Sequence, residues 1–413
     1  MSQTLNSTSN QAYRQTKVGE IPLDWDLVSL EELIADGPQN GIYKSKELYG
    51  EGTPIVRIDD FNNDGVFLTL NLQRVRLSNG EETLYSLNEN DILINRVNSL
   101  SHLGKCTLIP NLLEATVFES NMMRFHVDET RLLPEYLFRY LISNVTRKRL
   151  RNLAKRAVAQ SSINQGDVKS LLIPVPPLPE QRAIAHTLRT IQKAKEVRQR
   201  ELELEQERKA ALTQHFFTHG TRGEALKQTE LGFIPDSWIV SRFDSFGILQ
   251  RGFDITKKEQ EPGEYPVISS SGISSYHNSS KVKGPGVIIG RKGTLGTVHY
   301  VECDYWPHDT TLWVKEFKGN HPRFTAYFLA SLNLKRFDCG ASNPTLNRNT
   351  VHAMTIAYPQ KEEQQEIAAI LNACDRKITA LEQEAAFLDE LFRAMLEELM
   401  TGRLSALPLV EKG

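Results

Sequence analysis

Hydrophobic positions form their clearest pattern in the last part of the chain, after Pro359. Apolar residues recur there at alternating intervals of four and three, which is the spacing of a coiled-coil seam. The seam consists of Ile367, Leu371, Cys374, Ile378, Leu381, Ala385, Leu388, Phe392, Met395 and Leu399. Because glycine suits the residue that follows a helix, we expect this helix to end at Thr401-Gly402-Arg403.

An earlier segment has the same spacing but a charged middle. In the same register it consists of Ile184, Leu188, Ile191, Lys195, Arg198, Leu202, Glu205, Lys209, Leu212 and Phe216. Each helix would have about 38 residues and a length of about 57 Å at 1.5 Å per residue. Helices of this length need a partner in water, so we predict that the two pair as an antiparallel coiled coil with a pseudo-two-fold axis. The charged middle has two possible explanations. Either the helix packs through an apolar stripe in a shifted register, or its middle contacts partner proteins.

Two sequence motifs occur twice, in the same order. The segment Gln15-Thr-Lys-Val-Gly-Glu-Ile-Pro-Leu-Asp-Trp25 returns as Gln228-Thr-Glu-Leu-Gly-Phe-Ile-Pro-Asp-Ser-Trp238. The segment Glu180-Gln-Arg-Ala-Ile-Ala-His-Thr-Leu188 returns as Glu363-Gln-Gln-Glu-Ile-Ala-Ala-Ile-Leu371. Two repeats in one order indicate a duplicated unit. The region between the motifs is about 30 residues longer in the first copy, as expected of a protein whose two copies read different targets.

The regions between the motifs also correspond. Pro54-Ile-Val-Arg57 matches Pro266-Val-Ile-Ser269, and short β-branched runs of this kind predict strands. The segments that begin at Pro134 and Pro322 predict short helices with proline in the first turn. We therefore predict an α/β fold class, with two tandem α/β domains of one fold that are joined and separated by the long helices. The expected segments are a tail at 1–17, the first α/β domain at 18–177, the first helix at 178–220, the second α/β domain at 221–359, the second helix at 360–402 and a tail at 403–413.

Composition limits the class of protein. The chain is 40% hydrophobic, yet no stretch approaches the roughly 18 to 20 apolar residues that cross a bilayer. Its N-terminus lacks the apolar stretch of a signal peptide, so we expect a cytoplasmic protein that does not associate with a membrane. The cysteines match no zinc spacing and are expected to be free thiols. They are Cys106, Cys303, Cys339 and Cys374.

The net charge of −2 does not by itself indicate a nucleic-acid-binding protein, but the charge is uneven. Residues 360–413 hold 6 basic and 11 acidic residues. Basic residues gather elsewhere, in ten consecutive positions that contain no acid. They are Arg147, Lys148, Arg149, Arg151, Lys155 and Arg156. Such a run is usually a solvated helix face, and contact with DNA phosphates is the alternative.

The order of these features resembles the specificity subunit of type I restriction–modification enzymes, from about Gln15 to Arg403. The resemblance is most specific at the two Gly-x-Ile-Pro-x-x-Trp segments that begin at Gly19 and Gly232, and at the Glu-Gln helix starts at Glu180 and Glu363. The stretch Gly286–Gly296 is also similar to one common in such domains. The first domain departs from it, because Asn95-Arg96-Val97-Asn98 stands where the second has Gly290-Arg291-Lys292-Gly293.

The resemblance implies a division of labour between subunits. Each α/β domain would be a target-recognition domain that reads one half of a split double-stranded DNA target, with an unspecified spacer between the halves. The helices would dock two modification subunits, which bind S-adenosylmethionine and methylate adenine, and would set the spacer. A restriction subunit that consumes ATP, with Mg, would join this core. This chain would then hold no cofactor, no metal and no catalytic residue.

Two alternatives to the resemblance remain. No P-loop pattern occurs, and Asn343-Pro344-Thr345-Leu346 lacks the second proline and the aromatic ring of an adenine-methylating loop. A metal-dependent endonuclease acting alone could use Asp236 and Glu316-x-Lys318, since such sites combine carboxylates with a lysine. The other alternative is a coiled-coil scaffold that does not bind DNA.

Candidate DNA contacts divide by chemistry. Phosphate contacts set position, whereas base-edge contacts set sequence. Arginines on loops could read guanine through their forked donors, and these are Arg57, Arg96, Arg251 and Arg291. For Arg96 and Arg291 a salt bridge repeated with the fold is the alternative. Candidate phosphate ligands are Lys105, Arg147, Lys148, Arg149, Arg151, Lys281, Lys283 and Lys292.

Overall fold

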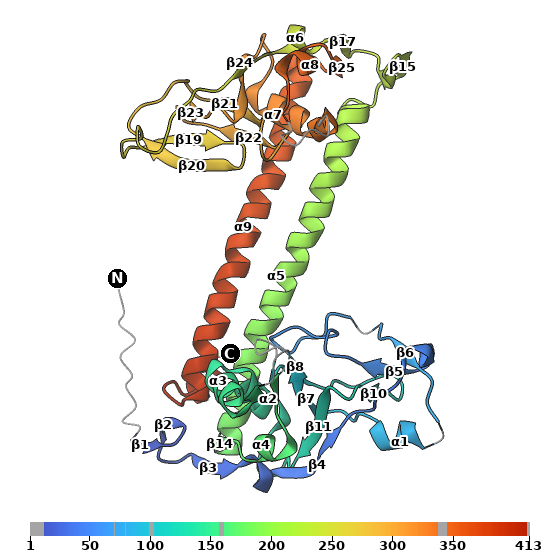
Figure 1. Ribbon diagram of the computed structural model, residues 1–413, viewed down its shortest axis with the longest axis vertical. Coiled ribbons are helices and arrows are strands. Elements are labelled where there is room, and N and C mark those ends of the chain that lie inside the picture. Colours follow the sequence, from blue (N-terminus) through green and yellow to red (C-terminus); the bar gives the residue numbers. More distant parts are fainter. Residues whose placement is uncertain are drawn as a thin grey trace. The chain divides into compact units, whose positions relative to one another are not determined.

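The structure is a computed structural model that describes residues 12–69, 71–78, 80–98, 103–156, 161–337 and 345–410. It divides into two compact units, and each is described by itself (Figure 1). The first unit combines residues 1–197 with residues 385–413, and the second consists of residues 198–384. Each unit therefore holds one α/β region together with a part of both long helices.

The first unit is built on a four-stranded antiparallel sheet of order β4-β11-β7-β9 and a three-stranded sheet of order β10-β5-β6. The strands of the first sheet are β4 (Ile34–Asn40), β11 (Met122–Val127), β7 (Ile92–Asn95) and β9 (Cys106–Leu108). Those of the second are β10 (Val117–Phe118), β5 (Tyr49–Val56) and β6 (Arg74–Val75), and β10 runs parallel to β5. Every residue of β7 is buried, which explains its continuous apolar run.

Smaller elements complete the first unit. Short pairings join β1 (Tyr13–Thr16) to β2 (Gly19–Pro22), β3 (Asp26–Ser29) to β14 (Leu172–Val175), and β8 (Val97–Asn98) to β13 (Ser161–Ser162), which also pairs with β12 (Lys155–Arg156). The helices are α1 (Glu81–Tyr85), α2 (Pro134–Ile142), α3 (Asn144–Leu153), α4 (Gln165–Lys169) and α10 (Leu407–Val410), with 3-10 turns η1 (Leu30–Glu32) and η2 (Lys46–Leu48). As predicted, α2 begins with proline in its first turn.

The second unit repeats this arrangement. Its four-stranded sheet has the order β18-β24-β21-β22, from β18 (Ile248–Arg251), β24 (Thr311–Glu316), β21 (Gly286–Gly290) and β22 (Val298–Val301). Its three-stranded sheet consists of β20 (Gly272–His277), β19 (Tyr265–Ser269) and β23 (Trp306–Pro307), and β23 runs parallel to β19. The other elements are β15 (Leu226–Thr229), β16 (Gly232–Pro235), β17 (Ile239–Arg242), β25 (Thr355–Tyr358), α6 (Phe243–Phe246), α7 (Pro322–Ser331), η3 (Leu334–Phe337) and α8 (Arg348–His352).

Corresponding strands occupy corresponding places in the two units, so the prediction of two α/β domains of one fold is confirmed. The units differ mainly in their connections. After α2 the first unit has the ten-residue helix α3, whereas the described residues that follow α7 form the four-residue turn η3. The extra turns of α3 are part of the additional length of the first copy.

Each unit has its own core. In the first, Trp25 and Phe125 are fully buried together with Leu188 of the long helix α5 (Leu178–His219). In the second, Phe246 and Phe324 are buried with Leu371 of the long helix α9 (Lys361–Met400). The helices thus supply part of each core, which explains why their seams begin with apolar residues.

Both predicted seams are buried or half-buried, and the helices run antiparallel where they pair. In the second unit, Arg198 Nε lies 2.9 Å from Glu384, and Lys377 Nζ lies 3.2 Å from Glu205. In the first unit, Lys195 Nζ lies 2.5 Å from Asp389. The charged middle of α5 is therefore matched by opposite charges on α9, and its seam is not shifted.

The ends of the helices also follow the sequence pattern. Gly402 has φ +67° just after α9, and Gly220 has φ +68° just after α5. Both are in the left-handed region where glycine is favoured, as a C-terminal cap requires. Across the part of the chain that is described, none of the helices combines the length and hydropathy needed to span a membrane.

Candidate nucleic-acid interface

The glutamines of the repeated Glu-Gln motif form hydrogen bonds between each long helix and its α/β region. Gln181 accepts a hydrogen bond from the backbone N–H of Leu133 at 2.8 Å and donates to the carbonyl of Pro176 at 2.8 Å. Gln364 accepts from the N–H of His321 at 2.9 Å and donates to the carbonyl of Pro359 at 2.9 Å. Both glutamines are buried, so these motif residues have a structural role.

The glutamates beside them connect different parts of each unit. Trp25 Nε1 donates to Glu180 at 3.0 Å, and Ser405 Oγ donates to the same carboxylate at 3.0 Å. In the second unit Glu363 accepts from the N–H of Thr221 at 2.7 Å. In the first unit the paired Trp and Glu of the sequence motifs are thus joined by a hydrogen bond and belong to the frame of the unit.

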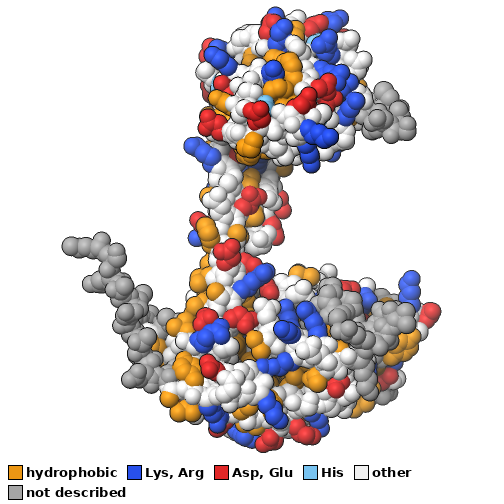
Figure 2. All heavy atoms as spheres, turned by 60° about the vertical axis from the view of Figure 1, so that its left-hand side comes forward, with side chains coloured by type: hydrophobic (Ala, Val, Ile, Leu, Met, Phe, Trp, Pro, Cys, Tyr) orange, Lys and Arg blue, Asp and Glu red, His pale blue; other side chains and the backbone are white. Residues whose placement is uncertain are grey.

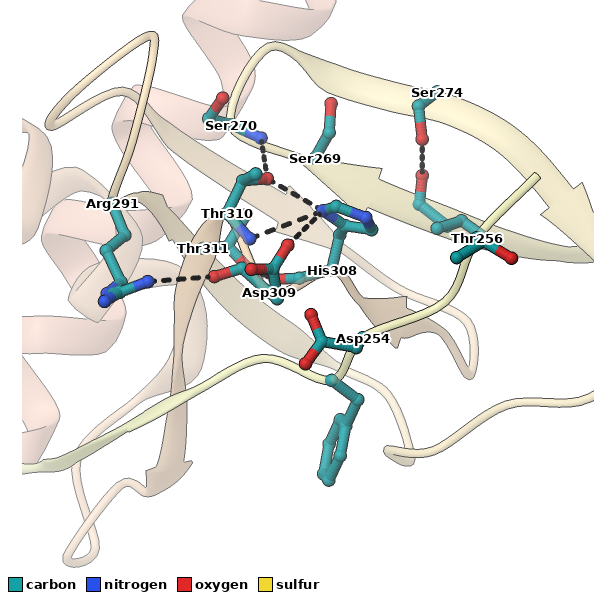
Figure 3. A network of polar contacts seen from close by, with 12 residues as sticks. Asp254, Thr256, Ser269, Ser270, Ser274, Arg291, His308, Asp309, Thr310 and Thr311 are labelled. Atoms are coloured by element: carbon teal, nitrogen blue, oxygen red, sulfur yellow. Dashed lines mark hydrogen bonds and ion pairs between the residues drawn. The ribbon is translucent and has the colours of Figure 1, made fainter. Parts of the chain in front are cut away.

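A polar network lies at the loop between β23 and β24 in the second unit (Figure 3). Arg291 Nη1 donates to the backbone carbonyl of Asp309 at 3.3 Å. His308 Nδ1 lies 3.0 Å from Thr310 Oγ1, and the N–H of Ser270 donates to that same hydroxyl oxygen at 3.4 Å. In Figure 3 the side chain of Arg291 and the backbone N–H of Ser270 reach this loop from outside, whereas His308 and Thr310 belong to the loop.

The first unit contains the counterpart of this contact. Arg96 Nη1 donates to the carbonyl of Ser120 at 3.2 Å, and the backbone N–H of Arg96 donates to the carbonyl of Asn121 at 2.9 Å. The backbone N–H of Arg291 likewise donates to the carbonyl of Thr310 at 2.8 Å. Among the described residues each guanidinium donates to a backbone carbonyl, so a repeated hydrogen bond stands there in place of the repeated salt bridge.

The other two candidate base readers form ion pairs with acidic side chains. Arg251 Nη2 lies 3.0 Å from Asp309 Oδ2, and about half of its side chain is exposed. Arg57 Nη1 donates to Gln73 Oε1 at 3.0 Å, and Arg57 Nε lies 3.4 Å from Glu119. Its guanidinium carbon lies 5.9 Å from the centre of the Tyr49 ring.

Each α/β region has a polar hollow beside its three-stranded sheet. The hollow of the first unit is lined by cations, amides and one tyrosine, among them Lys44, Lys46, Tyr49, Arg57, Gln73 and Arg74. That of the second is lined mainly by hydroxyl groups, together with an imidazole, a carboxylate, one lysine and one amide, among them Asp254, Lys257, Gln260, Ser269, His308 and Thr310. The two hollows therefore present different hydrogen-bonding groups.

The basic run of the first unit is only partly available to a ligand. Arg149 donates to the carbonyl of Val18 at 2.6 Å and to the hydroxyl of Tyr140 at 2.8 Å. Arg147 donates to the carbonyl of Asn63, whereas Lys148 is exposed. Arg151 is half-buried. The interpretation of this run as one uniformly solvated face is wrong, because α3 directs Arg147 and Arg149 toward other parts of the unit.

The remaining lysines differ in exposure. Lys105 is 8% exposed and its Nζ donates to the carbonyl of Ile58 above the ring of Phe61. Burial lowers the pKa of Lys105 from its usual value, although the carboxylates of Asp59 and Asp60 oppose this effect. Lys281 and Lys283 are exposed, and Lys281 Nζ lies 4.7 Å from the centre of the Trp306 ring. Lys292 is half-buried.

The nuclease residues show no common site. Glu316 forms an ion pair with Lys318 at 2.8 Å, and Asp236 is an exposed residue after β16. In the described ranges no group of three or more His, Cys, Asp or Glu side chains could hold a metal. Cys339, Asn343, Pro344 and the side chains of Lys155 and Arg156 lie outside the part of the chain that the structure describes.

The surface charge is mixed. In the view of Figure 2, lysine and arginine side chains alternate with acidic side chains on each unit and do not merge into one large basic patch. This agrees with the net charge of −2.

Several polar residues of these sites were not predicted from the sequence as DNA contacts, namely Glu119, Gln73, His308, Asp309 and Thr310. None belongs to a repeated motif. Their position was one available signal. Glu119 follows β10, which runs parallel to β5, and His308 follows β23, which runs parallel to β19.

The arrangement matches a known class of protein. A family model described as the type I restriction modification DNA specificity domain matches residues 22–206 and 235–388. The chain is 24% identical to a putative type I restriction enzyme MjaX specificity subunit of Methanocaldococcus jannaschii, over 95% of this chain and 96% of that protein. It is 28% identical to the type I restriction enzyme StySPI specificity subunit of Salmonella potsdam, over 50% of this chain and 44% of that protein.

A solved structure supports the fold. The S subunit of a type I restriction–modification system from M. genitalium aligns with a TM-score of 0.64 and 17% identity, covering 91% of this chain and 96% of that one. With most of its length matched by the family model, this chain belongs to the family of type I restriction–modification DNA specificity domains, and carries two of them. The resemblance inferred from the repeated motifs is thereby confirmed.

Proposed function

We propose that this chain recognises DNA sequence for a type I restriction–modification complex and performs no catalysis itself. Each α/β region reads one half of a bipartite target. The observation that carries this proposal is that the same sheet order recurs in both units while the polar hollow beside it changes chemistry. Two α/β regions with the same sheets but different residues in the hollow are suited to recognising two different half-sites.

The candidate contacts then have different roles. Lys148, Lys281, Lys283, Lys292 and Arg151 contact phosphates, because a lysine or arginine near the surface neutralises backbone charge without reading sequence. Arg57 and Arg251 reach base edges. Arg96 and Arg291 position the loops beside them. Lys105, Arg147 and Arg149 hydrogen-bond within the protein, so we leave them out of the interface.

The long helices have two functions in this proposal. Their outer faces dock two modification subunits, which bring S-adenosylmethionine, and a restriction subunit with ATP and Mg joins the assembly. The pairing of α5 with α9 fixes the spacer between the half-sites. This role is supported by the ion pairs between α5 and α9 in each unit, which fix the register of the two helices.

The endonuclease alternative has no observation in its favour, because Glu316 is paired with Lys318 and the family model that matches the chain is one of DNA specificity. The decisive experiment maps methylated adenines in host DNA with and without this gene. A bipartite motif that disappears with the gene supports the proposal. DNA cleavage by the purified chain with Mg and no partner would contradict it.

A further inference from the structure

The two hollows lie at the same place in the repeated fold. In the first unit the N–H of Glu119 donates to the carbonyl of Val56 at 3.1 Å, and Arg57 is the residue that follows Val56. In the second unit the N–H of His308 donates to the carbonyl of Ile268 at 2.9 Å, and Ser269 is the residue that follows Ile268. Arg57 with Glu119 therefore corresponds to Ser269 with His308.

The neighbouring strand confirms this correspondence. The carbonyl of Gln73 accepts from the N–H of Ile55 at 2.9 Å, and Ser275 pairs with Val267 at the equivalent place. Gln73 lines the first hollow and Ser275 the second. Two independent points of the backbone thus place the two pairs at one position of the fold.

We propose that this position determines base specificity in both domains, with Arg57 reading a guanine in one half-site and Ser269 with His308 reading the corresponding base in the other. The inference rests on the proposed function, since it names the residues by which each domain distinguishes bases.

Contacts within the protein restrict the conformation of the Arg57 side chain, as expected for a residue that recognises a base. Glu119 is buried, accepts from the N–H of Ile58 at 2.9 Å and lies 3.4 Å from Arg57 Nε. Gln73 fixes Nη1 at 3.0 Å, and the Tyr49 ring lies beneath the guanidinium. These contacts limit the rotamers of a long side chain, so that less entropy is lost when it binds a base.

The guanidinium still has donors to offer. Nη2 of Arg57 makes no hydrogen bond to any residue that the structure describes, and Nη1 keeps a second proton beyond the one donated to Gln73. The side chain is 38% exposed. A forked pair of N–H donors matches O6 and N7 of guanine, which are both acceptors in the major groove.

The second domain offers different chemistry at this position. Ser269 Oγ donates to the carbonyl of Gly272 at 3.0 Å and lies 3.1 Å from Ser271 Oγ. His308 Nδ1 contacts Thr310, which leaves Nε2 without a hydrogen bond among the described residues. A hydroxyl and one ring nitrogen provide single contacts instead of a fork. The base preference at this position should therefore differ between the half-sites.

The test uses the full chain assembled with its modification subunits, after methylation mapping has given the wild-type target. In Arg57→Ser, one guanine of one half-site should lose its preference by roughly 5- to 150-fold, the range for a bidentate contact. The other half-site and the spacer should be unchanged, which also shows that the complex is assembled. Arg57→Lys keeps the charge but not the planar fork, and since lysine can also donate to guanine it should keep only part of the preference.

A modified duplex isolates the atom that is read. Replacing that guanine with 7-deazaguanine removes N7 and should weaken binding by the wild-type complex at least about fivefold. The Arg57→Ser complex should show no such penalty. The control Arg76→Ser, on an exposed arginine that does not line the hollow, should keep the wild-type base preference and the wild-type penalty.

The second domain is tested by Ser269→Ala with His308→Ala, which should relax one position of the other half-site only. The inference is overturned if Arg57→Ser keeps the wild-type guanine preference, if the first domain's half-site has no guanine, or if the double variant changes no base of its half-site. Failure of the proposed function looks different, because the wild-type complex would then methylate without any bipartite preference.

Discussion

The guanidinium of Arg291 donates a hydrogen bond to the backbone carbonyl of Asp309 across 3.3 Å. The contact positions a loop whose other residues, His308 and Thr310, line the polar hollow. Since Arg96 makes the equivalent contact with Ser120 in the other unit, we interpret both arginines as positioning residues.

Arg291→Met should therefore lower the free energy of unfolding by about 1–2 kcal/mol, the value of a partly exposed hydrogen bond from a charged donor. It should also broaden one half-site over more than one base. Urea unfolding and methylation mapping give the two readouts, and the exposed Arg348→Met is the control. Loss of preference at one base with unchanged stability would instead make Arg291 a direct reader.

Glu205 gives the helix pairing a dependence on pH. The hydrogen bond from Arg208 lowers the pKa of Glu205 below its usual value of 4.5, burial opposes this, and Lys377 adds to the lowering. A carboxyl with a lowered pKa stabilises the fold above about pH 4.5, and that stabilisation is lost as the pH falls through the lowered value.

Glu205→Gln should accordingly be less stable than the wild type at pH 7, and the difference should shrink below about pH 4.5. Urea midpoints measured between about pH 7 and pH 3.5 test this. The neighbouring Glu203→Gln, whose carboxylate is about half exposed and pairs with Arg200, is the matched control. A difference that stays constant across this range would show that Glu205 does not stabilise the helices through its charge.

The basic run of α3 should separate into two kinds of residue. Lys148 is exposed, so Lys148→Ala should flatten the slope of log affinity against log salt by up to about 0.9, the value for one phosphate contact. Arg149→Ala should mainly reduce stability, because it removes the hydrogen bonds to Val18 and Tyr140. Equal effects of the two variants on the salt slope would contradict this assignment.

The helix seams show how much the sequence could predict. A repeat of apolar positions follows from helical geometry alone, so the register of both seams was predicted and the burial of Leu202 and Glu205 agrees with it. The repeated motifs likewise predicted one fold for both domains. Their Gln181 and Gln364 proved structural, because a buried amide with three hydrogen bonds fixes the helix start.

The candidate contacts were less predictable. Arg57 meets Glu119 across 62 positions and Arg149 meets Val18 across 131, and no local pattern reports such pairs. Lys105 was proposed as a phosphate ligand on its charge, but its carbon chain and ammonium group are buried against Phe61. Residue type gives the chemistry of a side chain, whereas only the tertiary fold decides where it points.

The antiparallel pairing changes how the spacer can be altered. Four residues added after Arg200 in α5 alone would shift Leu202 and Lys209 by about 6 Å along α9 and break their contacts. Matched insertions after Arg200 and after Glu382, which lie opposite each other between the pairs Arg198–Glu384 and Glu205–Lys377, should preserve them.

Four added residues rotate the remainder of a helix by a net of about 40°, close to the roughly 35° of one base pair. The matched variant should therefore recognise both original half-sites with a spacer longer by one base pair, and the single insertion should be inactive. Methylation mapping checks this. An active matched variant with the original spacing would mean that the helices do not set the spacer.

The central claim is that each domain reads its own half of the target independently. It is tested most directly by replacing Asn40–Leu171 with the corresponding segment of a relative and mapping methylated adenines in a host that carries the hybrid. The frame residues Gln181 and Trp25 stay in place, so the hybrid should fold and assemble. We predict that one half-site changes while the other half and the spacer remain as in the wild type. A change in both half-sites together would contradict independent reading.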